Sequence, residues 1–240
     1  MIYKIICSLF FYTTALLTFC TIGPLFIFLS VLVPSKYYVF ARITSQLMLF
    51  SLGIRVKIIN YKYYSDPQIY MFNHSSFIDP FLFAYCITDK STGVVAKEIY
   101  KYPIFGHMLK AYKAIPIDRK NKSSAINSIT QAEKTLKQGI NIIILPEGTR
   151  TTTGYLKPFK KGGFHMAINT QSLIIPIGSI GAYKFKPKNS WLLNPCTVTL
   201  KYGEPELVTN YDKLGVDGLL KLYEKKFVEL TGKEFKDEKL

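Results

Sequence analysis

The feature that most constrains this chain is an uncharged apolar stretch near its amino terminus. No charged residue lies between Lys4 and Lys36, and leucine, isoleucine, phenylalanine and valine dominate the segment. An apolar run of about 18 or more residues suits a helix buried in a lipid bilayer. A cleaved signal peptide is the alternative. It would have an apolar core of about 7–15 residues and a small-residue cleavage site, and neither feature appears in this stretch. We therefore expect residues 1–52 to form a membrane-anchoring helical element.

Pro24, next to Gly23, stands inside this stretch. Proline lacks the amide hydrogen that a helix interior uses, so we expect the helix to kink or end there. Residues 5–23 would span about 28 Å as a helix, barely enough for a hydrocarbon core of about 30 Å. Two geometries stay open. One is a single span, and the other is a kinked hairpin within one leaflet, completed by an interfacial helix at about 35–52.

The charge balance points to an anionic partner. The chain has 31 Lys and Arg against 16 Asp and Glu, a formal net charge of +15. Phospholipid headgroups, phosphorylated substrates and nucleic acid are the candidates, but the uncharged stretch argues against a nucleic-acid binder. Positive residues gather after the apolar run, beginning with Lys36, Arg42 and Arg55. This excess predicts that the rest of the chain lies at the cytoplasmic face of the inner or plasma membrane.

Residues 53–240 alternate between strand and helix patterns, which predicts one catalytic domain. We expect strands near 54–58, 68–72, 93–96, 114–117, 140–145, 174–177 and 197–200, and helices near 80–87, 121–138 and 211–230. Interleaved strands and helices indicate an α/β fold with a mixed, mostly parallel sheet flanked by helices. The four cysteines are scattered without metal-ligand spacing, so we expect no disulfide framework and no metal.

A polar segment directly after the strand expected at 68–72 holds the first candidate site residues. His74 and Asp79 are five residues apart, and on a regular helix they would not share a face. Ser76 and Asp79 form a Ser-x-x-Asp capping pattern, and Pro80 is tolerated in a first helical turn, so a turn could bring them together. A carboxylate that keeps one ring nitrogen protonated leaves the other free to accept a hydroxyl proton. The alternative is a capped helix start beside a core histidine.

A second polar segment, residues 145–150, follows the strand expected at 140–145. Gly148 allows close backbone approach, and the planar guanidinium of Arg150 suits phosphate. Glu147 could orient Arg150 or accept a hydrogen bond from a substrate hydroxyl. The alternative is a tight turn with a surface ion pair. Lys97 and Arg119 also follow expected strands, and either could be an ordinary surface charge.

Four short motifs follow one another along the chain. They are Asn-His-x-x-x-x-Asp at 73–79, Ile-Asp-Arg at 117–119, Pro-Glu-Gly-Thr-Arg at 146–150 and Ile-Pro-Ile at 175–177. Together they resemble the glycerolipid acyltransferase family, over about residues 51–207. The resemblance implies that His74 is a general base and Asp79 its orienting partner. It also implies an acceptor-phosphate site, with these residues: Glu147, Gly148, Thr149, Arg150 and, as helpers, Lys97 and Arg119.

The resemblance further implies a reaction. A fatty acyl group would pass from acyl-CoA or acyl carrier protein to the sn-2 hydroxyl of 1-acyl-glycerol-3-phosphate, giving phosphatidate without a cofactor. Membrane lipids would surround the enzyme. A different acceptor, such as glycerol 3-phosphate or another lysolipid, and a non-catalytic membrane scaffold stay open as alternatives. A serine hydrolase is disfavoured because no Gly-x-Ser-x-Gly elbow is present.

Overall fold

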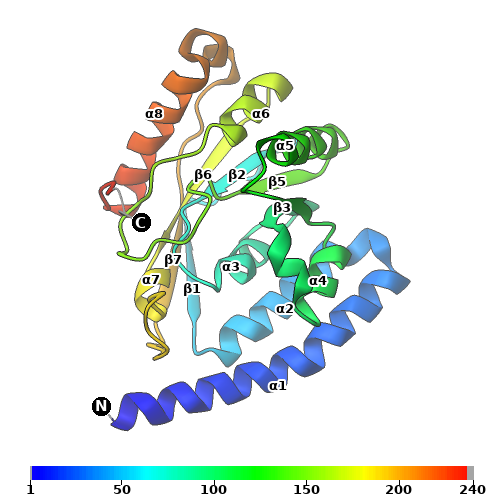
Figure 1. Ribbon diagram of the computed structural model, residues 1–240, viewed down its shortest axis with the longest axis vertical. Coiled ribbons are helices and arrows are strands. Elements are labelled where there is room, and N and C mark those ends of the chain that lie inside the picture. Colours follow the sequence, from blue (N-terminus) through cyan, green and yellow to red (C-terminus); the bar gives the residue numbers. More distant parts are fainter. Residues whose placement is uncertain (1, 237–240) are drawn as a thin grey trace.

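A single mixed sheet forms the centre of the molecule (Figure 1). The computed structural model describes residues 2–236, apart from the side chain of Lys122, and within them seven strands lie in the order β1-β7-β6-β2-β5-β3-β4. Only the β6–β7 pair is antiparallel. The predicted mixed, mostly parallel sheet is therefore confirmed. The strands are β1 (Arg55–Ile59), β2 (Ile69–Phe72), β3 (Ser91–Ala96), β4 (Ile115–Ile117), β5 (Asn141–Ile144), β6 (Ile174–Ile180) and β7 (Thr197–Tyr202).

Helices cover both faces of this sheet. The helices are α1 (Ile2–Leu32), α2 (Tyr37–Ser51), α3 (Asp79–Cys86), α4 (Phe105–Ala111), α5 (Lys122–Lys137), α6 (Gly162–Thr170), α7 (Ala182–Phe185) and α8 (Tyr211–Thr231). Alternate residues of β2 serve the two faces, as a strand's period of two requires. Tyr70 and Phe72 pack with α2, α3 and α7, whereas Ile69 and Met71 pack with α5, α6 and α8. Every residue of β2 and β5 is buried, which explains why these short strands are apolar apart from Asn141.

The two amino-terminal helices form a hairpin against the edge of this core (Figure 1). α1 continues through Pro24, so the expectation that the helix would end there is wrong, whereas a kink at Pro24 stays a prediction. Gly23 packs closely against α4, where an added Cβ would lie 2.7 Å from Ile104 Cγ2. The hydroxyl of Thr14 donates to the carbonyl of Ser51 (2.7 Å), which ties the start of α1 to the end of α2.

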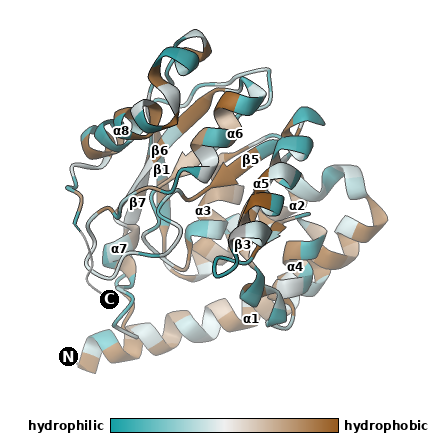
Figure 2. Cartoon of the chain, turned by 45° about the horizontal axis from the view of Figure 1, so that its top comes forward, coloured by the Kyte–Doolittle hydropathy of each residue, from teal (hydrophilic) through white to brown (hydrophobic). Residues whose placement is uncertain are grey.

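α1 presents apolar side chains outward along its length, and Figure 2 shows it in mostly brown and pale colours. By length and composition it could cross a membrane. Its large exposed side chains include Ile6, Leu9, Phe10, Leu16, Leu17 and Phe28. A soluble protein rarely exposes so extended an apolar surface to water.

Candidate active site

Strand register brings the two polar segments of the sequence together. β2 and β5 are parallel neighbours, with Met71 opposite Ile144. His74 lies three residues after Met71, and Glu147 lies three residues after Ile144. Both loops therefore leave the sheet at the same carboxyl-terminal edge, where α/β proteins hold their ligands.

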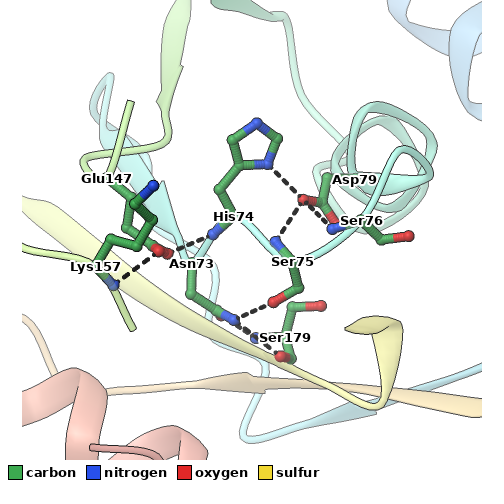
Figure 3. Close-up of polar contacts among 8 residues, drawn as sticks. All are labelled: Asn73, His74, Ser75, Ser76, Asp79, Glu147, Lys157 and Ser179. Atoms are coloured by element: carbon green, nitrogen blue, oxygen red, sulfur yellow. Dashed lines mark hydrogen bonds and ion pairs between the residues drawn. The ribbon is translucent and has the colours of Figure 1, made fainter. Parts of the chain in front are cut away.

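His74 and Asp79 lie in direct contact at this edge. His74 Nδ1 is 2.8 Å from Asp79 Oδ2, and the same oxygen accepts hydrogen bonds from the backbone amides of Ser75 (2.9 Å) and Ser76 (3.0 Å) (Figure 3). Asp79 is fully buried. Since the carboxylate can only accept, Nδ1 carries the proton and Nε2, on the opposite side of the ring, keeps its lone pair. Nε2 is therefore available as a base.

The turn between these residues forms differently from the predicted capping pattern. α3 starts at Asp79, with Pro80 in its first turn as expected, but Ile78 occupies the cap position and no side chain caps the helix. The Ser76 hydroxyl has no hydrogen-bond partner among the described residues, so the serine half of the predicted capping pattern does not form. The acidic half does form, because the Asp79 carboxylate accepts the backbone amide of Ser76.

Asn73 fixes the loop to the neighbouring strand, a role that the sequence did not reveal. Its Nδ2 donates to Ser75 Oγ (2.8 Å) and to the Ser179 carbonyl (3.1 Å), while its Oδ1 accepts from the Ser179 amide (2.6 Å). The side chain is buried, so its polar atoms require such partners. The available signal was an amide side chain placed directly after a buried strand.

Glu147 holds the backbone of His74 in place. Its Oε1 accepts the backbone amide of His74 (2.6 Å), and its Oε2 accepts that of Lys157 (3.0 Å) (Figure 3). Burial raises the pKa of Glu147 to about 8; the two amides oppose this shift and the nearby Asp79 charge adds to it. Both oxygens are thus engaged by backbone, and Glu147 does not line the cavity described below. This geometry points to positioning of His74 rather than substrate contact.

Two other residues of the second motif, Thr149 and Arg150, line a cavity. Gly148 has a φ of 73°, in the left-handed region that glycine adopts without strain. Thr149 accepts a hydrogen bond from Lys157 Nζ (3.1 Å). Arg150 is half-buried and has no hydrogen bond or ion pair with the residues that the structure describes. A guanidinium left without an acidic partner beside a histidine is suited to an anionic ligand.

The cavity itself has a volume of about 650 Å³, within the range of small-molecule sites. His74 and Arg119 line it together with Thr149 and Arg150. The remaining walls are largely apolar and come from the helices and from strands β3 and β5. They include Phe19, Phe26, Ala41, Met48, Phe81 and Met108. Such a space, polar at one side and hydrocarbon-lined elsewhere, fits an amphipathic ligand with an alkyl chain.

The predicted basic helpers separate in the structure. Arg119 lines the cavity, whereas Lys97 does not. Lys97 instead forms an ion pair with Asp118, the residue before Arg119. The structure therefore brings Arg119, Thr149 and Arg150 to the cavity with His74, and leaves Lys97 paired outside it.

The fold and site together define an α/β protein whose histidine–aspartate dyad faces a lipid-sized apolar cavity. Residues 53–180 match the family model described as Acyltransferase, and the chain belongs to this family.

Relatives and a solved structure agree with this assignment. A coconut (Cocos nucifera) protein named 1-acyl-sn-glycerol-3-phosphate acyltransferase is 32% identical over 191 residues, covering 79% of this chain but only 62% of the relative. A Haemophilus influenzae protein of the same name is 29% identical over 88% of this chain and 90% of its own. The crystal structure of the Thermotoga maritima 1-acyl-sn-glycerophosphate acyltransferase has a TM-score of 0.81 and 22% identity, covering 95% of this chain and 94% of that one. This last likeness concerns the fold.

Proposed function

We propose that this protein transfers a fatty acyl group from a thioester carrier to the free sn-2 hydroxyl of 1-acyl-glycerol-3-phosphate, giving phosphatidate. The observation that carries the proposal is the 2.8 Å contact between His74 Nδ1 and Asp79 Oδ2 beside an amphipathic cavity. The names of the coconut and H. influenzae relatives refer to the same acceptor.

The acceptor suits the two sides of the cavity. Its phosphate would meet Arg150 and Arg119, which share the cavity with His74. Its acyl chain would occupy the apolar part between α1, α2 and α4. Arginine binds phosphate with a planar, bidentate donor geometry, so the headgroup is oriented as well as attracted. With the phosphate fixed, the glycerol hydroxyl is held near His74 Nε2.

The chemical step then requires only a base and positioning. Nε2 of His74 takes the hydroxyl proton while the hydroxyl oxygen attacks the thioester carbonyl carbon. The tetrahedral intermediate collapses, the carbon–sulfur bond breaks, and the imidazolium returns a proton to the departing thiolate. Asp79 stabilises the imidazolium formed on the way. A general base supplies about 10²–10⁴-fold of rate, and orientation of the two substrates supplies much of the rest.

The amino-terminal hairpin explains how lipid reaches this site. We propose that residues 1–52 anchor the domain of residues 53–240 at the cytoplasmic face of the membrane, with α1 in lipid. Phe19 and Phe26 of α1 line the cavity, so the anchor is itself part of the substrate site. A lysolipid can then enter from the bilayer while a water-soluble acyl-CoA or acyl carrier protein approaches from the aqueous side.

A parallel substrate assay tests this proposal. The full chain, purified in detergent, is offered 1-acyl-glycerol-3-phosphate, lysophosphatidylcholine and glycerol 3-phosphate, each with acyl-CoA and with acyl carrier protein. We expect phosphatidate as the main product with one or both carriers. Higher kcat/KM for either other acceptor would replace the proposed acceptor, and no transfer to any of the three would favour a non-catalytic scaffold.

A further inference from the structure

The carboxyl end of β6 delivers another cation to the site, one outside every motif of the sequence. α7 follows β6 directly, and its Tyr183 hydroxyl donates to the carbonyl of Thr152 (2.8 Å). Gly154 lies so close to the Tyr183 ring that an added Cβ would be 2.8 Å from it. α7 is therefore docked on the loop that carries Arg150.

The chain after α7 is fixed beside the catalytic loop. Phe185 is fully buried, with its ring centroid 6.0 Å from that of Phe77, a residue of the loop between His74 and Asp79. The next residue, Lys186, holds its Nζ 5.7 Å from the centroid of the Phe77 ring. Phe77 also lines the cavity. Lys186 is thus held at the edge of the site by an aromatic face.

Three cations gather here: Lys186, Lys188 and Arg150. Burial and the neighbouring charge of Arg150 both lower the pKa of Lys186. Lys188, two residues further on, lines the cavity with Arg150. In the part of the chain that the structure describes, Lys186 and Arg150 form no ion pair, whereas lysines elsewhere, such as Lys62 and Lys161, pair with carboxylates. Two cations held close together are stabilised when an anion lies between them.

We propose that Lys186 binds a substrate phosphate together with Arg150. These two residues, from the loops after β6 and β5, form a phosphate-binding site that we call the phosphate seat. This inference rests on the proposed function and specifies its anion site. The ligand class is a phosphate ester. Its source is either the acceptor headgroup or the phosphates of the acyl carrier, and separate kinetic measurements distinguish them.

The test compares Lys186→Gln with Lys184→Gln in the full chain. Neither lysine lines the cavity itself, but only Lys186 lies against the ring of Phe77, which does. Lys184 is exposed on the same short segment, so it serves as the matched control. We expect Lys186→Gln to raise the KM for 1-acyl-glycerol-3-phosphate about tenfold, the effect of one charge-assisted contact, with kcat within about twofold. Lys184→Gln should keep wild-type values, and Lys186→Arg should restore most of the affinity.

The outcomes separate cleanly. A rise in the KM for the acyl donor alone supports the seat and assigns it to the carrier phosphates. Wild-type KM values for both substrates in Lys186→Gln overturn the inference. If the wild-type protein does not acylate the lysolipid, the proposed function fails, and the seat is then judged by thermal unfolding. Glycerol 3-phosphate should raise the unfolding temperature of the wild type more than that of Lys186→Gln, and an equal response overturns the seat.

Discussion

Oε1 of Glu147 accepts a hydrogen bond of 2.6 Å from the backbone amide of His74, across 73 residues of sequence. The carbonyl of His74 accepts another from the backbone amide of Thr151 (3.0 Å). Both polar groups of the His74 backbone are therefore held by the loop that presents Arg150. The proposed base and the proposed anion-binding loop are therefore linked by hydrogen bonds, so a change in either should alter the other.

Asp79→Asn tests the orienting role of the carboxylate. The amide is nearly isosteric but carries no charge, so it no longer stabilises the imidazolium that forms during transfer. We expect kcat to fall about a hundredfold or more, with the KM for the lysolipid within about twofold. Initial rates at saturating substrate measure this, with circular dichroism as the control for folding. An unchanged kcat would mean that the contact is structural only.

Glu147→Gln tests the link between the two loops. The two oxygens of Glu147 serve two amides, and glutamine can accept from only one while its NH₂ faces the other. One buried amide is left unsatisfied, which costs about 1–3 kcal/mol of unfolding free energy. Displacement of the His74 backbone should also lower kcat, by up to about a hundredfold. Loss of stability with full kcat would contradict the positioning role.

The same variant carries a pH signature. Burial raises the pKa of Glu147 to about 8, against an ordinary value of 4.5, so the folded protein holds this proton more tightly than the unfolded chain. The resulting stabilisation is complete below about 4.5 and is lost as pH rises through about 8. The unfolding temperature of the wild type should therefore approach that of Glu147→Gln between pH 5 and 8.5. A gap between the two proteins that does not change with pH would contradict this pKa.

Gly148→Ala tests whether the left-handed backbone shapes the anion loop. An alanine there costs about 1–2 kcal/mol in strain, although the nearest atom to its Cβ, Lys160 Cγ, would be 3.7 Å away. Gly139 is the matched control because it has a φ of 84°, has open space around it and follows α5. Both variants should lose similar stability in thermal unfolding. Only Gly148→Ala should raise the KM for the lysolipid, and equal KM values would exclude a role for this turn.

Ala41→Phe tests the use of the cavity by an acyl chain. Ala41 lines the cavity from α2, next to Phe26 and Met108 in the packed cluster between the hairpin and α4. A phenyl ring there should fill part of the space and shift preference toward shorter chains. Overpacking is expected to cost about 1–3 kcal/mol of stability. Ile43→Phe, at an exposed position of the same helix, is the control, and an unchanged chain-length profile in Ala41→Phe would place the chain elsewhere.

The sequence predicted the strands well for a definite physical reason. Short apolar runs such as 68–72 and 140–145 are buried on both faces of a parallel sheet, so composition alone marks them. The contact between His74 and Asp79 was likewise expected from their motif. What composition did not contain was register. The pairing of Met71 with Ile144 depends on the whole sheet. This register brings Glu147 to the backbone of His74.

Two local expectations were met only in part. The sequence predicted that the first helix would end or kink at Pro24, and α1 does not end there. It also predicted a Ser76–Asp79 capping pattern, of which only the bond from the Ser76 amide to the Asp79 carboxylate forms. Lys186 had no local signal at all, because its place beside Arg150 depends on how α7 docks. The boundary between residues 52 and 53 stays a prediction.

The central claim is that the imidazole of His74 removes the acceptor proton. The most direct measurement is transfer from acyl-CoA or acyl carrier protein to 1-acyl-glycerol-3-phosphate by His74→Gln, with binding of the lysolipid and thermal unfolding measured in parallel. We predict that kcat falls by at least about a hundredfold while lysolipid affinity and unfolding temperature stay near wild type. Wild-type turnover by a folded His74→Gln protein would contradict the account.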